Sequence, residues 1–451
     1  HILNPYSKSL SEIINQQMKE TKLIFILFFM AGFLHAQSLY FPPLLGKEWA
    51  TTTPEQLGWC TEKIDSLYDF LQQKDSKAFM VLKDGKIVLE KYFGTFTQDS
   101  IWYWASAGKT LTGFLTGIAQ EQGYLSINDK SSKYLGSGWT SLDTAQENKI
   151  SIRHQLTMTT GLDDGDDPDC TLPSCLTFKA EPGTRWAYHN APYTLMDSVI
   201  ESATGKNYNQ YFTQVVKSKT GMTGLWVKTG YNNIFYSNTR SMARFGILML
   251  NKGTWNKTPV LADTVYFNAM IHSSQNMNKS YGYLTWLNGK QNYMLPGSQI
   301  VFNGSLMKDA PEDMFAAMGK NGQIINISPS LGLVVIRTGN PPNGSSGFVP
   351  NLFNNDIWKY LNKVICKTTS TNSISTKQNN LIVTNPVQNI LYLNRDAVTG
   401  RFKLEIIDIN GNILLTDENN TEPDISNLKP DLYYVRIISS DKFKLQPFVK
   451  I

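Results

Sequence analysis

The chain has 451 residues, of which 41% are hydrophobic and 18% are charged. This composition excludes an intrinsically disordered chain, because it supplies enough apolar residues to form a core. The formal net charge of +5 is small and spread along the sequence, which argues against a nucleic-acid partner. A chain of this length is expected to fold as one large domain with a small second one.

The first 36 residues have the pattern of an export signal. Met18 is followed by a lysine-bearing start, an apolar run over residues 23–34 and the small residue Ala36 at the cleavage position. The run is too short to span a membrane, and a buried core helix is the alternative interpretation. We therefore expect export, removal of residues 1–36 and no membrane span in the mature protein. Whether residues 1–17 are translated stays open.

Export makes the four cysteines candidates for disulfides. Cys170 and Cys175 are close in sequence and are predicted to staple one loop. Cys60 and Cys366 bracket the large domain and are predicted to tie its first and last helices. The connectivity is not fixed by sequence alone. Soft ligands are too few and too scattered for a zinc site, so we predict no metal.

Residues 101–123 read as a helix that is apolar on more than one face, which is typical of a helix at the centre of a domain. Its first turn carries Ser106 and Lys109, and residues three apart lie on one face of a helix. Burial disfavours the charged form of a lysine and lowers its pKa, so that its neutral amine can accept a proton. The pair is therefore a candidate for an activated serine nucleophile.

Spacing alone is weak evidence for such a pair, because Ser-x-x-Lys recurs at residues 305/308, 426/429 and 439/442. A phosphate-binding loop that ends at Gly108-Lys109-Thr110 is excluded, because Tyr103 stands where that loop needs a glycine. The role of Ser106 must therefore be judged from the rest of the chain.

The rest of the large domain alternates between helices and strands. The stretch 161–179 is acidic and broken by prolines, which predicts a solvated loop. Calcium binding by its carboxylates is the alternative, although their spacing matches no EF-hand. Helices are predicted over residues 62–72, 151–160, 193–203 and 352–365, a hairpin over 77–94 with its turn at Asp84-Gly85, and two strands within 314–339 that are split at Ser328-Pro329.

Two polar clusters lie on connections between these elements, where site residues concentrate. The first is Tyr188-His189-Asn190, shortly before the helix at 193–203. The second is Lys320-Asn321-Gly322, just before the strand that ends at Ser328. Tyr-x-Asn is a common pattern, and Tyr236-Ser237-Asn238 is a rival for the first cluster.

The C-terminal part differs in composition from the large domain. Residues 367–380 are rich in Ser, Thr and Asn and almost free of apolar residues, which predicts a linker. Residues 381–451 contain only strand-like runs, and Asn410-Gly411 is a favoured two-residue hairpin turn. These runs predict a small all-β sandwich. A carbohydrate-binding or adhesive module is one interpretation of such a sandwich.

In chain order, Ser106-x-x-Lys109, Tyr188-x-Asn190 and Lys320-Asn321-Gly322 resemble the three motifs of the serine β-lactamase and penicillin-binding-protein superfamily. The second motif is similar to that of the class C and esterase-like branch. The resemblance implies an α/β (α+β) fold for residues 37–366, in which an antiparallel sheet is flanked by helices and joined by a helical subdomain.

The resemblance also implies the catalytic residues. Ser106 attacks a carbonyl and becomes acylated. Lys109 and Tyr188 share the role of base, each with a lowered pKa. No metal or cofactor takes part in this chemistry.

Further residues are implied to bind the substrate. Asn190 binds the substrate carbonyl, and the Lys320 ammonium favours a substrate carboxylate and an ionised tyrosine at the second motif. The backbone N–H groups of Ser106 and of Gln323, which follows Gly322, form an oxyanion hole.

These roles predict an exported serine hydrolase that cleaves a small ester, amide or peptide-like substrate through an acyl-serine intermediate. A β-lactamase or D-Ala-D-Ala carboxypeptidase is one alternative. Asn321 counts against it, since this residue replaces a threonine whose hydroxyl often touches a substrate carboxylate in the superfamily. A non-catalytic ligand-binding relative is the other alternative.

The tail resembles the C-terminal sorting domain of the type IX secretion system of Bacteroidetes. The resemblance rests on Asn385-Pro386, the hairpin at Asn410-Gly411, the stretch Asp424 to Leu428, the run LYYVRI and a lysine at the C-terminal end. It implies the type IX machinery as a partner, and delivery through the periplasm to the cell surface or the medium.

Overall fold

The computed structural model describes residues 39–451 except 166, 343–348, 367–380, 384–385, 396–397, 399, 410, 440–441 and 451. The predicted export signal, the predicted linker, Asn385 and Asn410 therefore lie outside the described residues. Within the described part of the chain, no helix is both long and apolar enough to cross a membrane.

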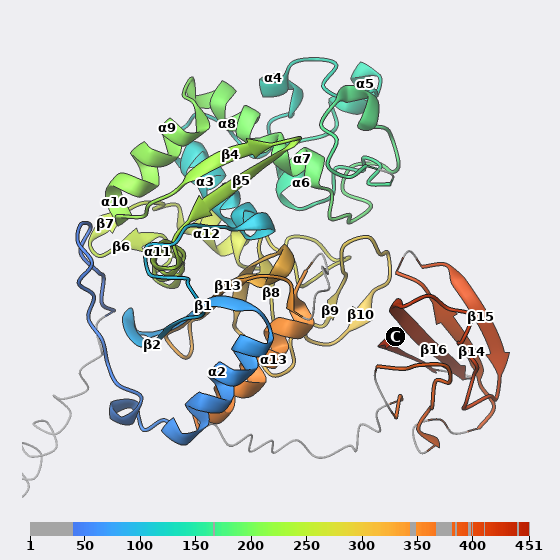
Figure 1. Ribbon diagram of the computed structural model, residues 1–451. Coiled ribbons are helices and arrows are strands. Elements are labelled where there is room, and N and C mark those ends of the chain that lie inside the picture. The colour runs from blue at the N-terminus through green and yellow to red at the C-terminus, as the bar shows by residue number, and fades with distance from the viewer. Residues whose placement is uncertain are drawn as a thin grey trace, which may run out of the picture. The chain divides into compact units, whose positions relative to one another are not determined.

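A six-stranded antiparallel sheet forms the centre of the large domain, in the order β2-β1-β13-β12-β11-β8 (Figure 1). Met80 lies opposite Ile336, so strands from the two ends of the domain's sequence are neighbours in the sheet. β11 is not predicted, because its sequence FAAMG has no β-branched residue. The strands are β1 (Ser76–Lys83), β2 (Lys86–Tyr92), β8 (Trp286–Leu287), β11 (Phe315–Gly319), β12 (Gln323–Ser328) and β13 (Leu333–Gly339).

Helices cover both faces of this sheet. α11 packs on one face, where a methyl group added to Gly246 would lie 2.3 Å from the Val334 Cγ1. α13 packs on the other face, where the Arg337 guanidinium lies 4.9 Å from the centre of the Phe353 ring. Positions 334 and 337 point to opposite faces, because side chains alternate along a strand. The flanking helices are α2 (Ile64–Gln73), α11 (Thr239–Leu250) and α13 (Asn351–Val364).

Both predicted disulfides are formed. Cys60 and Cys366 are joined with their Cα atoms 5.4 Å apart, next to the contact between α2 and α13, where the Phe70 and Tyr360 rings stack at 4.3 Å. Cys170 and Cys175 are joined with their Cα atoms 5.9 Å apart.

A helical region lies beside the sheet (Figure 1). Its main element is α3, which is buried over residues 108–119. The predicted helix at 151–160 is shorter in the structure, and the predicted helix at 193–203 is divided in two. The α-helices of the region are α3 (Gly108–Glu121), α4 (Ser132–Leu135), α5 (Thr144–Glu147), α6 (Ile152–Leu156), α7 (Asn190–Thr194), α8 (Met196–Thr204), α9 (Tyr208–Phe212), α10 (Ser218–Thr220) and α12 (Thr264–Met270).

The helix is predicted to begin at residue 101, but the chain before α3 instead forms a short strand, β3. Trp102 lies opposite Ser237 and Tyr103 opposite Tyr236, so β3 joins a small three-stranded sheet in the order β3-β5-β4. The partner strand is more than a hundred residues away, and a local pattern cannot show it. The small strands are β3 (Trp102–Tyr103), β4 (Leu225–Thr229), β5 (Asn232–Ser237), β6 (Thr254–Trp255), β7 (Thr258–Pro259), β9 (Asn292–Tyr293) and β10 (Phe302–Asn303).

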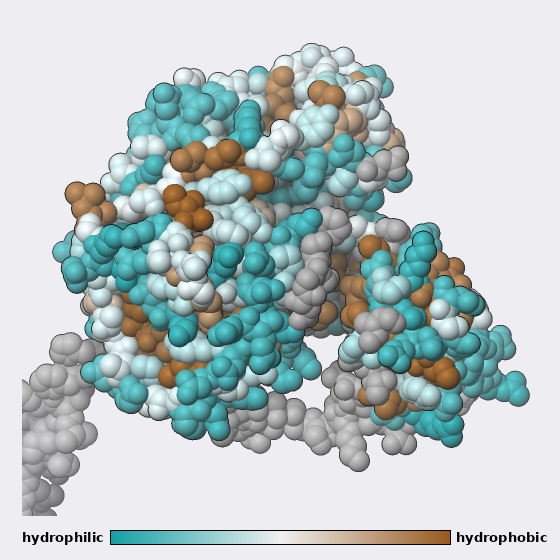
Figure 2. All heavy atoms as spheres, in the orientation of Figure 1, coloured by the Kyte–Doolittle hydropathy of each residue, from teal (hydrophilic) through white to brown (hydrophobic). Residues whose placement is uncertain are grey.

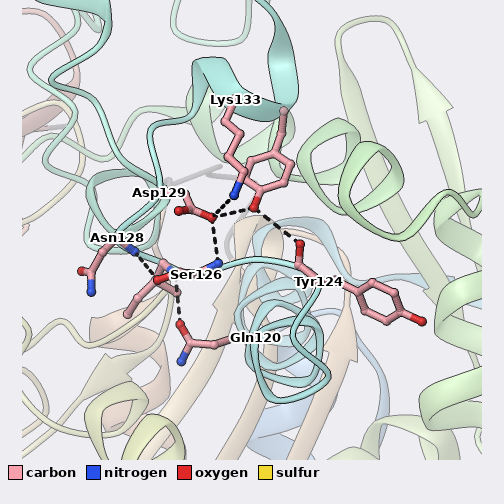
Figure 3. Close-up of polar contacts among 8 residues, drawn as sticks. Gln120, Tyr124, Ser126, Asn128, Asp129 and Lys133 are labelled. Atoms are coloured by element: carbon pink, nitrogen blue, oxygen red, sulfur yellow. Dashed lines mark hydrogen bonds and ion pairs between the residues drawn. The ribbon is translucent and has the colours of Figure 1, made fainter.

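A polar cluster fixes the chain where it leaves α3 (Figure 3). The Asp129 carboxylate accepts hydrogen bonds from the Tyr134 hydroxyl at 2.6 Å, the Lys133 amine at 2.9 Å and the Ser126 N–H at 3.0 Å. The bond from Tyr134 is the main reason why the pKa of Asp129 is lowered. Gln120 on α3 accepts from the Ile127 N–H at 2.9 Å and so ties this connection to the buried helix.

The C-terminal part is all-β, as predicted. Its four strands form one antiparallel sheet in the order β15-β14-β16-β17, and isolated bridges such as Ile382 with Leu393 accompany it. It has a core of its own, which includes Leu391, Leu404 and Phe448. The strands are β14 (Lys403–Ile407), β15 (Ile413–Glu418), β16 (Asp431–Ser439) and β17 (Lys442–Lys450).

The face of the molecule in Figure 2 is mostly hydrophilic, with apolar residues exposed in separate places. Leu225 on β4 and Val265 on α12 are among the exposed apolar side chains. Single exposed apolar residues are normal in folded proteins.

Candidate active site

Ser106 and Lys109 lie together at the start of α3. Ser106 is the middle residue of the 3-10 turn η4 (Ala105–Ala107), which leads directly into α3, and Lys109 lies in the first turn of that helix. The Lys109 Nζ is 3.0 Å from the Ser106 Oγ. Ser106 is half-buried, whereas Lys109 is 3% exposed. Ser106 is therefore partly open to solvent, while Lys109 is almost completely enclosed.

The environment of Lys109 favours a neutral amine. Burial lowers the pKa of Lys109 to about 7, and the charge of Asp169 opposes this shift. Above this pH most of the amine is unprotonated, and it can then take a proton from the adjacent hydroxyl. The direction of the shift agrees with the prediction for a buried lysine.

The backbone turns sharply just before Ser106. Ala105 has a φ of 46°, in the left-handed region that residues with a Cβ rarely adopt. Strained backbone of this kind is often found next to reacting groups. No sequence signal marks this position, because alanine has no preference for that conformation.

The Lys109 amine is surrounded by residues from the cluster at 188–193. The Asn190 Oδ1 accepts a hydrogen bond from the Lys109 Nζ at 2.7 Å. The ring centres of Tyr193 and Tyr188 lie 4.2 Å and 4.9 Å from the same nitrogen. The structure therefore brings the predicted residues Tyr188 and Asn190 to the Ser106–Lys109 pair.

The rival cluster has structural contacts instead. Tyr236 pairs with Tyr103 in the small sheet. The Ser237 Oγ accepts a hydrogen bond from the indole N–H of Trp104 at 2.7 Å. Asn238 caps the start of α11. Each of the three residues therefore has a structural role, and no catalytic role is needed to account for them.

The surroundings of Tyr188 favour its neutral phenol. Burial raises the pKa of Tyr188 well above its usual value, and the neighbouring Ser106 hydroxyl offsets only part of this shift. The expected lowering of the tyrosine pKa is therefore wrong, because desolvation disfavours a phenolate. The hydroxyl lies beside Ser106 but has no hydrogen-bond partner of ordinary geometry among the described residues.

Gly319, at the end of β11, lies directly against the backbone of η4. A methyl group on Gly319 would be 2.4 Å from the Trp104 oxygen, 2.8 Å from the Ala107 nitrogen and 3.0 Å from the Ser106 nitrogen. A residue with a side chain does not fit there. Gly319 is absent from the predicted site residues, although it directly precedes the third motif.

The loop of the third motif, η7 (Lys320–Gly322), is held by hydrogen bonds from a buried arginine. Arg337 donates to the Asn321 oxygen at 2.6 Å and to the Gly322 oxygen at 3.1 Å. Burial lowers the pKa of Arg337 to about 9. The side chain of Lys320 is exposed.

Two further side chains of this loop are engaged in hydrogen bonds. The Asn321 amide donates to the Tyr103 hydroxyl at 2.7 Å. The Gln323 side chain is buried and bonded to Thr338 and Gly339, both at 2.7 Å. The hydrogen bonds of both side-chain amides therefore go to residues other than Ser106.

Two family models match separate parts of the chain. The model described as beta-lactamase matches residues 69–347, and the model described as secretion system C-terminal sorting domain matches residues 382–450. The first match includes every predicted catalytic and substrate-binding residue.

Individual proteins agree with the first match. An uncharacterized protein of Alkalihalophilus pseudofirmus is 25% identical over 302 residues, which cover 59% of this chain and 84% of that protein. A Bacteroides dorei protein provisionally named a beta-lactamase has a TM-score of 0.53 at 18% identity, over 68% of this chain and 99% of its own. A Bacillus anthracis protein provisionally named a 6-aminohexanoate-dimer hydrolase has a TM-score of 0.52 at 16% identity, over 73% of this chain and 91% of its own. At these identities the two structures establish the fold alone.

Proposed function

Since the chain belongs to the beta-lactamase family, we propose that it is a serine hydrolase that cleaves an ester or amide through an acyl intermediate on Ser106. The observation that carries this proposal is the 3.0 Å contact between the Ser106 hydroxyl and the buried Lys109 amine. A nucleophile within hydrogen-bond reach of a base with a pKa near 7 is the arrangement that acyl transfer needs.

In the first step, the neutral Lys109 amine takes the proton of Ser106 while the Oγ forms a bond to the substrate carbonyl carbon. The carbonyl oxygen then carries a negative charge, which backbone N–H groups stabilise. We assign this role to the N–H groups of Ser106 and Lys320, because Lys320 directly follows Gly319. The N–H of Gln323, the donor first predicted, is less well placed: Gln323 pairs with Gly319 across the hairpin, and paired Cα atoms lie about 4.5–5.5 Å apart.

In the second step, the bond from the carbonyl carbon to the leaving group breaks, and the leaving group takes a proton. Burial favours the neutral phenol of Tyr188, which lies beside Ser106, so this side chain is suited to donate that proton and to regain one from the Lys109 ammonium. Water then cleaves the acyl-serine ester through the same groups in reverse. Asn190 has its amide oxygen on Lys109, so we assign it to orienting the amine rather than to binding the substrate carbonyl.

A linear amide or ester is the substrate class that we favour. The Bacillus anthracis protein of this fold is provisionally named a 6-aminohexanoate-dimer hydrolase, and that name suggests an amide substrate. A β-lactam or a D-Ala-D-Ala peptide has a carboxylate that needs a partner, and the Asn321 amide is already bonded to Tyr103. The complete set of Ser106, Lys109 and Tyr188 counts against a non-catalytic relative.

The sorting domain over residues 382–450 assigns the protein to the type IX secretion route, with export to the cell surface or the medium. We therefore propose that its substrate is met outside the cell and that the type IX machinery is its transport partner.

Labelling with a fluorophosphonate probe tests the nucleophile. The probe forms a phosphorus–oxygen bond with an activated serine and releases fluoride, so peptide mapping locates the reacting residue. We expect one label, on Ser106, and none in Ser106→Ala, with the same thermal unfolding for both proteins. A label on Ser237 or Ser305 would contradict the assignment. Efficient labelling of Ser106 by a fluorescent penicillin would favour the β-lactam alternative.

A further inference from the structure

A chain of hydrogen bonds runs from Lys109 away from the nucleophile and ends on a carboxylate. Lys109 donates to the Asn190 Oδ1 at 2.7 Å, and the Asn190 Nδ2 donates to the Asp169 Oδ1 at 2.7 Å. Asp169 belongs to the acidic stretch 161–179, whose sequence predicts a solvated loop. Asp169 is half-buried, and its carboxylate is linked to Lys109 through Asn190.

The carboxylate fixes which end of the Asn190 amide faces Lys109. An ionised carboxylate only accepts hydrogen bonds, so the NH2 group of the amide must turn toward Asp169 and its oxygen toward the amine. Without Asp169 the amide can rotate by half a turn and present its NH2 group to Lys109. That group would then donate to the lone pair of the neutral amine.

The lone pair of Lys109 is what the proposed mechanism needs. A neutral amine has two N–H groups and one lone pair. One N–H is used by Asn190, and the face of the Tyr193 ring lies 4.2 Å from the nitrogen and can receive the other. The lone pair is thus left for the Ser106 hydroxyl at 3.0 Å. An amide turned the other way would compete with Ser106 for it.

The loop segment that carries Asp169 is pinned at two points. The Pro168 oxygen accepts a hydrogen bond from the Ala191 N–H at 2.9 Å, which docks the segment on the start of α7. The next residue, Cys170, is bonded to Cys175. Cys175 precedes Leu176, which is fully buried in a cluster with Leu162 and Ala191.

The disulfide thus links the residue after Asp169 to a side chain anchored in the core. On the other side of Asp169, the loop is largely polar and exposed at residues 165 and 167. The disulfide and the docking on α7 are therefore two restraints that act directly beside Asp169.

We propose that Asp169 is a positioning residue of the active site, which orients the Asn190 amide toward Lys109, and that the Cys170–Cys175 disulfide holds Asp169 in place. This inference rests on the proposed function. It makes full activity dependent on a bond that forms only after export to an oxidising compartment.

The rate of fluorophosphonate labelling of Ser106 tests the role of Asp169 without a known substrate. We expect Asp169→Ala to slow labelling about ten- to hundredfold, the size of effect that a displaced catalytic group produces. Asp169→Asn should be less affected, because its amide oxygen can still accept from Asn190. Asp163→Asn, which removes a carboxylate of the same loop that pairs with Lys179, should label like the wild type.

The pH dependence of labelling separates positioning from mere support of the loop. In the wild type, the rate should rise with pH through about 7, the pKa of Lys109. Among the described residues, the groups that face this amine besides Asp169 are the Ser106 hydroxyl, the Asn190 amide and two tyrosine rings, and the charge of Asp169 raises its pKa. Asp169→Asn should therefore move the midpoint to lower pH. Loosening of the loop would admit water and move the midpoint to higher pH, which would overturn the proposal.

The disulfide has a matched control in the same chain. We expect Cys170→Ala/Cys175→Ala to slow labelling measurably, though by no more than Asp169→Ala does, and to add little to it in the combined variant, because both act on the same contact. Cys60→Ala/Cys366→Ala should lower the unfolding temperature but label at the wild-type rate when folded.

Two outcomes would remove the proposal in different ways. Wild-type rates in Asp169→Ala or in Cys170→Ala/Cys175→Ala, with Ser106 still the labelled residue, would remove this inference alone. A wild-type protein in which Ser106 is not labelled would remove the proposed function as well.

Discussion

Lys109 and Tyr188 are both buried beside Ser106, and burial disfavours the charged form of each side chain. For the lysine this means a lowered pKa and a neutral amine, and for the tyrosine a raised pKa and a neutral phenol. The two groups are thus suited to opposite tasks. The amine can accept a proton from Ser106, and the phenol can donate one to the leaving group.

This division of tasks predicts that Tyr188→Phe affects substrates according to their leaving groups. Turnover of an alkyl ester or amide should fall by about two to four orders of magnitude, since a poor leaving group needs a proton. Labelling by a fluorophosphonate should change little, because fluoride leaves without one. Both rates are measured on the same preparation.

Tyr236→Phe is the matched control, because its ring lies in the small sheet, and both rates should stay near the wild-type values. An equal loss of the two rates in Tyr188→Phe would mean that the tyrosine acts before the attack, as a base.

At the scale of elements, the active site depends on the close approach of β11 to the turn η4. The end of the strand touches the backbone of residues 104, 106 and 107, so no side chain can give way there. The φ of Gly319 is −128°, which any residue adopts. The requirement for glycine is therefore purely steric.

Gly319→Ala should push β11 away from the nucleophile. We expect a loss of stability of about 1–3 kcal/mol, as for other overpacked sites, and a drop in Ser106 labelling of about a hundredfold, as for a displaced catalytic group. Thermal unfolding and labelling rates measure the two effects. Gly123→Ala is the control: it has open space around it but a φ of 74°, so it should lose stability and keep its labelling rate. Normal labelling of Gly319→Ala would show that the strand does not shape the site.

Features that depend on local spacing could be predicted from the sequence, whereas features that depend on distant partners could not. The buried character of α3, the hairpin at Asp84-Gly85 and the Ser106–Lys109 pair follow from local spacing, and all three are present. β3 and the role of Gly319 depend on partners more than a hundred residues away, which no local pattern encodes. Asp169 is predicted to lie in a solvated loop for a different reason: its partner Asn190 is only 21 residues away but lies on another element, and spacing in the sequence does not show that the two meet.

At the scale of the whole molecule, the first and last elements of the large domain contact each other. β1 pairs with β13, α2 packs on α13, and the Cys60–Cys366 disulfide joins residues 306 positions apart. Every proposed catalytic residue lies within this closed segment. The sorting domain has its own strands and its own core.

We therefore expect a chain that ends at Lys367 to keep its hydrolase activity but to lose export across the outer membrane. It retains Cys366 and all of α13, so its unfolding temperature and its rate of Ser106 labelling should match those of the hydrolase domain in the full chain. It lacks the residues matched by the sorting-domain model, so in a host with the type IX system it should accumulate in the periplasm. Fractionation and labelling of the same cells measure both properties. Loss of labelling in the shortened chain would make the tail part of the active site, and arrival of the shortened chain at the cell surface would mean that the tail is not the export signal across the outer membrane.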